Sequence, residues 1–199
     1  MIATRDPEPE KTTDPQWTWE LIQRLEWRRL EELVAAIVEW RPNFRAELAD
    51  FGEPGDPPIL VYRRGIEAPV LLIRCHRMVP GESPDLGDIE DLRHLMRRSG
   101  LDRGVFITPG YFAPGLRHAM RNATDVELLD GANLLELLRS APDDRTTRAL
   151  FAIATEGNYW IPTCHQCGSK MKKVEKSVFK RKSGWLCPNR ICGHELVYR

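Results

Sequence analysis

The sequence lacks any run of about 18 apolar residues, the length that a membrane-spanning helix needs. It also lacks a P-loop, a dinucleotide-binding glycine fingerprint, a Ser-His-Asp arrangement and an internal repeat. The first 16 residues are polar and contain three prolines, which is not the composition of a secretory signal. We therefore expect a cytoplasmic protein without a membrane partner, outside the enzyme classes that those motifs mark.

The chain also has no formal net charge, because 29 basic residues balance 29 acidic ones. The balance is not uniform along the chain. From residue 158 to residue 199, six Lys and three Arg face two Glu, a charge of +7, so residues 1–157 carry −7. Opposite charges on two segments indicate two modules with different partners.

Cysteine is almost absent before residue 160, where only Cys75 occurs, inside an apolar stretch that suits a core thiol. The other four follow the spacing Cys164-x2-Cys167, nineteen residues, Cys187-x4-Cys192. Two such pairs supply the four thiolates of a tetrahedral, structural Zn²⁺ site. Two disulfides are the alternative, but they suit a cytoplasmic chain poorly.

The segment between the cysteine pairs is cationic and lies among aromatic residues. Cations with interleaved aromatics suit a phosphate backbone and stacked bases. The candidate nucleic-acid-binding residues are Lys172, Lys173, Lys176, Lys180, Arg181, Lys182 and Trp185. The alternative is a solvated hairpin whose aromatics form a small core.

This module resembles the four-cysteine zinc ribbons at the C-terminus of bacterial type I topoisomerases. The likeness lies in the two cysteine pairs and in the stretch 184–188 (GWLCP), which places a glycine-aromatic pair before the third cysteine. The second pair is spaced slightly differently, so the likeness is to a class of ribbons. The resemblance implies contact with single-stranded DNA.

The rest of the chain alternates strands and helices, which predicts an α/β fold with a mixed, partly parallel sheet flanked by helices. We expect a flexible arm over 1–16, an α/β domain over 17–140, a linker with a connecting helix over 141–157 and the ribbon over 158–199. The expected helices cover 17–40, 85–99, 113–123, 134–139 and 148–155. The expected strands cover 44–51, 59–62, 70–75, 104–108 and 126–129.

Three stretches of the α/β domain resemble the Mrr-like restriction endonucleases of the PD-(D/E)xK nuclease superfamily. Residues 27–34 (WRRLEELV) look like the opening helix of that family. Residues 104–113 (GVFITPGYFA) look like its GVFVTTGxFS strand and turn, and residues 128–134 (LLDGANL) look like its LIDGxxL element. The resemblance implies a restriction-endonuclease fold that acts on DNA in restriction or defence.

The catalytic stretch departs from the family. The resemblance places Pro58 where the metal-binding Asp belongs, and Asp56 stands two residues earlier. Arg74 and His76 replace the Gln and Lys of the third strand. In one interpretation, the Mg²⁺-dependent phosphodiesterase site is degenerate or weakened, and the protein binds DNA. In the other, Glu31, Asp56 and His76 form a variant catalytic site that uses Mg²⁺ or Mn²⁺.

A third hypothesis is a protein-interaction subunit without enzymatic activity. Whether the chain is an enzyme is therefore left open by the sequence. The resemblance also implies DNA as a partner and a homodimer or larger defence complex as the assembly.

Overall fold

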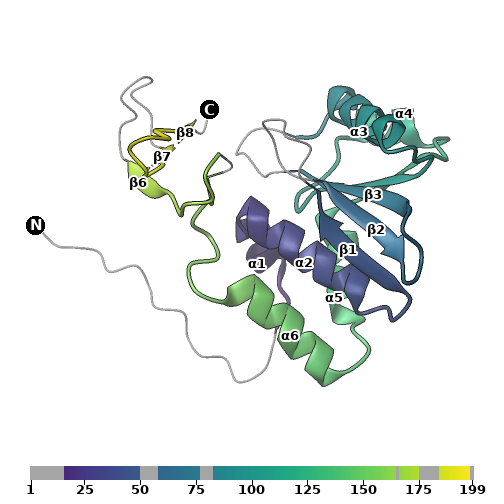
Figure 1. Ribbon diagram of the computed structural model, residues 1–199, viewed down its shortest axis with the longest axis horizontal. Coiled ribbons are helices and arrows are strands. Elements are labelled where there is room, and N and C mark those ends of the chain that lie inside the picture. The colour runs from purple at the N-terminus through teal and green to yellow at the C-terminus, as the bar shows by residue number, and fades with distance from the viewer. Residues whose placement is uncertain (1–15, 50–57, 77–82, 165, 175–183, 198–199) are drawn as a thin grey trace, which may run out of the picture.

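The computed structural model describes residues 16–49, 58–76, 83–164, 166–174 and 184–197 (Figure 1). Asp56, Lys176, Lys180, Arg181 and Lys182 lie outside the described residues, as do residues 1–15 of the arm expected over 1–16. Within the described ranges, no helix combines the length and the apolar character needed to cross a membrane.

A five-stranded mixed sheet forms the centre of the larger module, in the order β1-β2-β3-β4-β5. Strand β2 is antiparallel to both of its neighbours, β1 and β3, and β3, β4 and β5 are parallel. The strands are β1 (Phe44–Leu48), β2 (Ile59–Arg63), β3 (Pro69–Cys75), β4 (Gly104–Ile107) and β5 (Val126–Leu129). The expected mixed α/β architecture is confirmed.

Helices cover both faces of this sheet (Figure 1). They are α1 (Trp19–Arg24), α2 (Trp27–Glu39), α3 (Leu86–Arg98), α4 (Pro114–Met120), α5 (Gly131–Arg139) and α6 (Asp144–Thr155). Side chains of α1, α2, α5 and α6 pack on the face that carries Ile59, Ile73 and Ile107. Those of α3 and α4 pack with Leu72 and Phe106 on the opposite face, as strand alternation requires. Each face of the sheet therefore has its own hydrophobic cluster.

The strand ends nearest to the candidate site lie along one side of the sheet, which we call the carboxyl edge. The strands β3, β4 and β5 end there, and β2 begins there, because Ile59 pairs with Ile73 in the antiparallel register. The backbone N–H of His76 continues the ladder by donating to Ile107 O at 2.7 Å. Helix α2 packs against β1 after a short turn, so its N-terminal half points toward this edge.

The single helix expected over 17–40 is wrong. The chain breaks at Leu25 and Glu26 and forms α1 and α2 instead. Glu26 takes an extended backbone conformation, and its N–H donates to Tyr159 O at 2.9 Å. A long-range contact therefore overrides a hydrophobic periodicity that runs through the break.

Two other helices begin earlier than expected. Helix α5 starts at Gly131, because the carboxylate of Asp130 caps its first turn and the amide of Asn133 completes a capping box. Helix α6 starts at Asp144, where Asp143 accepts from Thr146 N at 2.7 Å. The buried side chains of α6 join the cluster formed by α2, so this connecting helix packs on the α/β core.

The smaller module is a three-stranded antiparallel sheet in the order β6-β7-β8. Its strands are β6 (Lys172–Val174), β7 (Gly184–Leu186) and β8 (Glu195–Val197). Its small core contains Cys164, Met171 and Cys187. A sheet this small buries little apolar surface, so it needs another source of stability.

Candidate functional site

The four cysteines of the smaller module come together as the spacing predicts. All four sulfur atoms lie within 4.8 Å of one another. Cys164 Sγ lies 3.6 Å from Cys192 Sγ, and Cys167 Sγ lies 3.3 Å from Cys187 Sγ. Four thiolates around one tetrahedral Zn²⁺ would stand about 3.8 Å apart, given a metal–sulfur bond of about 2.3 Å. The cluster can therefore hold a metal ion.

Two glycines shape the turns that present these thiols. Gly168 and Gly193 have φ of 71° and 57°, a left-handed conformation that glycine adopts without a steric penalty. The N–H of Gly168 donates to Cys164 O at 2.8 Å, and that of Gly193 donates to Asn189 O at 2.9 Å. These bonds close each cysteine pair into a turn that points its sulfurs inward.

The surroundings of Cys167 and Cys187 shift the pKa values of their thiols in opposite directions. Hydrogen bonding with Ser169 lowers the pKa of Cys167 to about 6. Burial raises the pKa of Cys187 to about 12, since its thiolate would lose hydration. Four neighbouring thiolates need a cation to ionise together at neutral pH, and a bound divalent ion provides that charge.

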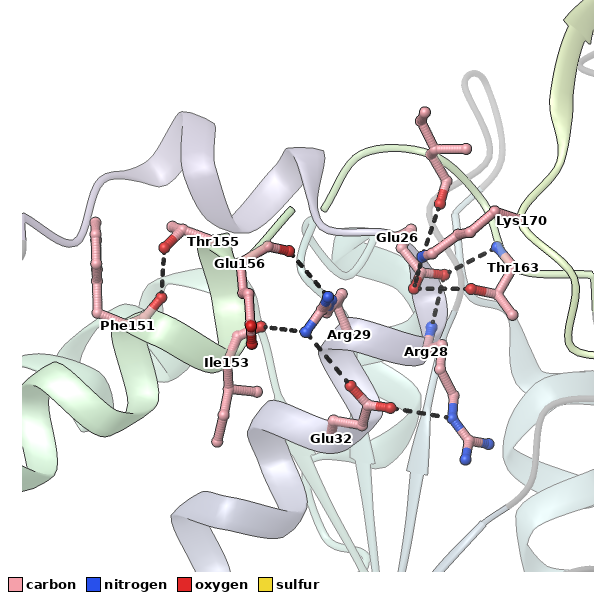
Figure 2. Close-up of polar contacts among 11 residues, drawn as sticks. Glu26, Arg28, Arg29, Glu32, Phe151, Ile153, Thr155, Glu156, Thr163 and Lys170 are labelled. Atoms are coloured by element: carbon pink, nitrogen blue, oxygen red, sulfur yellow. Dashed lines mark hydrogen bonds and ion pairs between the residues drawn. The ribbon is translucent and has the colours of Figure 1, made fainter. Parts of the chain in front are cut away.

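The cysteine module docks on the junction between α1 and α2 through one carboxylate (Figure 2). The side chain of Glu26 is 2% exposed and accepts four hydrogen bonds. Thr163 donates through its backbone N–H at 3.2 Å and its hydroxyl at 3.1 Å. Lys170 Nζ donates at 2.9 Å, and the N–H of Arg28, in the first turn of α2, donates at 3.1 Å. Glu26 therefore joins the N-terminus of α2 to both ends of the first cysteine turn.

Further contacts support this junction. The indole N–H of Trp27 donates to Thr163 O at 2.7 Å in a buried position. Arg29 donates to the carbonyl oxygens of Ile153 at 3.0 Å and Glu156 at 2.9 Å, which ties α2 to the end of α6 (Figure 2). A groove of about 500 Å³ remains between the start of α2 and the first cysteine turn. Polar and charged side chains dominate its lining, including Arg28, Glu32, Gln166 and Lys170.

The expected nucleic-acid-binding residues that the structure describes lie on two paired strands. Lys172 and Lys173 are exposed on β6, and Lys173 pairs with Trp185 of β7. The Trp185 side chain is half-buried against the cysteine cluster. Lys172 and Lys173 can therefore reach a ligand in solvent, while Trp185 also contributes to the small core.

Two of the three candidate catalytic residues lie within the described residues. Glu31 is 1% exposed and lies on the buried side of α2, in its N-terminal half. His76 follows the last residue of β3 at the carboxyl edge, with its ring 6.1 Å from that of Phe106. Within the described ranges, the four cysteines are the only set of three or more His, Cys, Asp or Glu ligands that could share a metal. Convergence of Glu31, Asp56 and His76 stays a prediction.

The two stretches that carry the family likeness most specifically meet at the carboxyl edge. Thr108 donates its backbone N–H to Leu129 O at 3.0 Å, and Gly131 donates to Gly110 O at 3.0 Å. A Cβ at Gly131 would fall well inside the contact distance of the Pro109 carbonyl oxygen. The glycine is therefore required by the close approach of the loop after β4.

The cluster of Glu26, Thr163 and Lys170 is a feature that sequence reasoning missed. Glu26 lies in an apparently continuous amphipathic pattern, and its partners are 137 and 144 residues away. The only local signal is the position of Thr163 and Lys170 beside the first cysteine pair, where side chains can reach a neighbouring module.

Among known protein families, residues 22–138 match the restriction endonuclease family Mrr_cat. The chain belongs to the Mrr-type restriction endonuclease family. The match covers the α/β module from α1 to α5, in agreement with the expected resemblance. The four-cysteine module lies C-terminal to the matched Mrr-type region.

Two solved restriction endonucleases are similar to this chain. The first is MspJI in complex with a 27-mer oligonucleotide, 18% identical, with a TM-score of 0.45, covering 66% of this chain and 32% of that chain. The second is the DNA modification-dependent enzyme AspBHI, 16% identical, with a TM-score of 0.46, covering 74% of this chain and 44% of that chain. The chain thus spans less than half the length of either. No curated protein matches it.

Proposed function

We propose that this Mrr-type protein binds DNA in restriction or defence, with a zinc ribbon as its DNA-contacting module and a weakened phosphodiesterase site. The observation that carries the proposal is the docking of the cysteine module on the N-terminus of α2, the end of that helix directed toward the carboxyl edge. This docking supports a single DNA path that touches both modules.

The ribbon provides the positive charge for that path. Zinc is the proposed ion, because four thiolates in two short pairs are its usual structural ligand set. A Zn²⁺ with four thiolates leaves the ribbon at about +5 instead of +7, still opposite in sign to DNA. Lys172 and Lys173 would contact phosphates, together with Lys176, Lys180, Arg181 and Lys182, and Trp185 would stack on a base.

Weakened cleavage follows from the residues at the family's catalytic positions. Pro58 has no carboxylate to bind Mg²⁺, and Arg74 adds a positive charge on the strand that ends at the carboxyl edge. His76 can accept a proton but does not carry the permanent charge of the lysine that it replaces. These substitutions oppose the binding of a hard cation.

An active endonuclease with a variant site is the second candidate function. It is favoured by Glu31, a buried carboxylate in the N-terminal half of α2, the half directed toward the carboxyl edge. In this arrangement Glu31 and Asp56 would hold Mg²⁺ or Mn²⁺, and His76 would accept a proton from the attacking water. The metal would polarise the scissile phosphate and lower the pKa of the bound water.

A nuclease assay separates these two functions. The full chain is incubated with single- and double-stranded DNA in Mg²⁺ or Mn²⁺, beside Glu31→Gln, Asp56→Ala and His76→Ala. We expect little or no cleavage by any of the four proteins. Cleavage by the wild type that these substitutions abolish would overturn the weakened site and establish the variant site.

DNA binding is tested by its dependence on salt. Removing one phosphate-binding side chain should reduce the slope of log affinity against log salt by about 0.9 on duplex DNA. We expect wild type to bind with a steep slope and Lys172→Glu/Lys173→Glu to bind more weakly with a shallower one. Absent or salt-insensitive binding would instead favour a protein-interaction subunit.

A further inference from the structure

The Glu26 carboxylate belongs to two structural units at once. For α2 it is the N-terminal cap, since it accepts a hydrogen bond from the backbone N–H of Arg28. For the first cysteine turn it is the acceptor of Thr163 and Lys170. Because the side chain is 2% exposed, water cannot easily replace either set of donors.

The donors on the ribbon side depend on the same turn that presents the first two cysteines. Thr163 directly precedes Cys164, and Lys170 follows Cys167 by three residues. Thr163 and Lys170 face each other in an isolated antiparallel bridge, and the N–H of Cys164 donates to Ser169 O at 2.9 Å. A metal bound to Cys164 and Cys167 would therefore also fix the positions of Thr163 and Lys170.

We propose that Glu26 is a positioning residue that couples metal occupancy of the cysteine cluster to the order of the N-terminal turns of α2. With the metal bound, the closed turn delivers three hydrogen bonds to Glu26. Without it, Thr163 and Lys170 lose their fixed spacing, and a buried carboxylate loses donors that include its only cation among the described residues. An underbonded buried carboxylate is costly, so Glu26 moves toward solvent and the cap of α2 is lost.

The consequence for the nuclease fold is local. The first helical bond of α2, from Leu30 N to Glu26 O at 3.1 Å, depends on the backbone of Glu26. Glu31 lies in the next turn. The cysteine cluster thus influences a candidate catalytic residue from a different module, through a contact that involves no ligand of the metal.

Coupling of this kind is reciprocal. If the metal stabilises the start of α2, then the contacts to Glu26 strengthen metal binding by the same factor. The ribbon should therefore hold its metal less tightly when Thr163 and Lys170 cannot bond to Glu26, although all four cysteines remain in place.

The test uses the full chain and leaves Glu26 unaltered, so that any loss of the α2 cap results from the missing ribbon donors and not from removal of the carboxylate itself. The double variant Thr163→Val/Lys170→Met removes the side-chain donors from the ribbon. Lys173→Met is the matched control, because it removes an exposed lysine of the same module that lies on β6. Hydrogen exchange of residues 30–33 and zinc affinity, measured by competition with a chromophoric chelator, are the two readouts.

We expect zinc removal to speed exchange of residues 30–33 in wild type and in the control by about tenfold or more. In the double variant these amides should exchange fast even with zinc bound, and zinc affinity should fall by about tenfold. The change in exchange rate and the change in zinc affinity measure the same coupling free energy, the first at α2 and the second at the metal site.

The inference rests on the metal site proposed above, and the two fail differently. If zinc binds wild type but leaves exchange in α2 unchanged, the coupling is wrong and the metal site stands. If the double variant responds to zinc as the control does, Glu26 is not the link. If wild type binds no zinc, the metal site and the coupling are both overturned.

Discussion

Trp27 donates its indole N–H to the carbonyl oxygen of Thr163, a buried hydrogen bond of 2.7 Å that joins residues 136 positions apart. The ring lies in the first turn of α2 and the acceptor directly precedes a cysteine of the cluster. The α/β core and the cysteine module are therefore joined by an interface with defined partners.

Replacing this ring tests how much the interface contributes to stability. Trp27→Phe keeps an aromatic side chain but leaves the Thr163 carbonyl without its donor. We expect the free energy of unfolding to fall by about 1–3 kcal/mol, the cost of an unsatisfied buried polar group. Chemical denaturation gives the value. Trp40→Phe, at the other end of α2, is the control and should cost less.

The loop after β4 sets a steric requirement at Gly131. Gly131→Ala would place a Cβ 2.9 Å from the Trp19 ring and closer still to the Pro109 carbonyl oxygen. Overpacking of this kind costs about 1–3 kcal/mol, and backbone atoms cannot yield as a flexible side chain would. Thermal unfolding measures the loss.

Gly115→Ala provides a matched control within α4, because, apart from its chain neighbours and the backbone of its own helix, no heavy atom of the described residues lies within 4 Å of its Cβ position. Alanine favours a helix over glycine by up to about 1 kcal/mol, so this variant should be neutral or more stable. Equal destabilisation by both substitutions would contradict the close contact at Gly131.

Metal content tests the cysteine cluster directly. Cys187→Ser removes a buried ligand, and the variant should lose its bound zinc and the fold of the ribbon. Elemental analysis after dialysis, together with near-ultraviolet circular dichroism, reports both. Cys75→Ala, in β3, should keep one zinc per chain. Zinc retention by Cys187→Ser would contradict a four-thiolate site.

An ion pair at the start of β5 predicts a dependence of stability on pH. Arg93 bonds to Asp125 at 2.6 Å and 3.0 Å and lowers the pKa of that carboxyl. A lowered pKa stabilises the fold above the usual carboxyl range, and that contribution disappears as pH falls through the folded value. Because the pair is partly exposed, we expect an effect of about 1 kcal/mol at most.

The measurement compares wild type with Asp125→Asn. Urea unfolding at pH 7 should show wild type as the more stable protein, and the difference should shrink toward pH 3. A difference that stays constant across this range would show that the ion pair does not contribute through its charge.

The sequence was most informative where a requirement is local. The spacing of Cys164, Cys167, Cys187 and Cys192 predicted their cluster, because a short pair on a turn can present both of its sulfurs to one ion. The alternation of apolar strands and helices is also a local pattern, and it predicted the mixed sheet. The helix expected over 134–139 is also present, although it begins three residues earlier, at Gly131.

Long-range contacts limited the prediction elsewhere. The break at Glu26 depends on Tyr159, Thr163 and Lys170, which no window of the sequence brings near it. The apolar spacing on either side of the break is compatible with one continuous helix, so periodicity alone gives the wrong answer. The candidate catalytic residues are a different case, because one of the three, Asp56, lies outside the described residues.

The Glu26 junction also has a consequence for the order of folding. Its contacts join residues 137–144 positions apart, and such distant pairings form late because the loop that they close is long. On a ribosome, the sheet can be complete while the start of α2 still awaits residues 163 and 170. The final shape of the nuclease fold is therefore reached only after the cysteine module has emerged and closed its first turn.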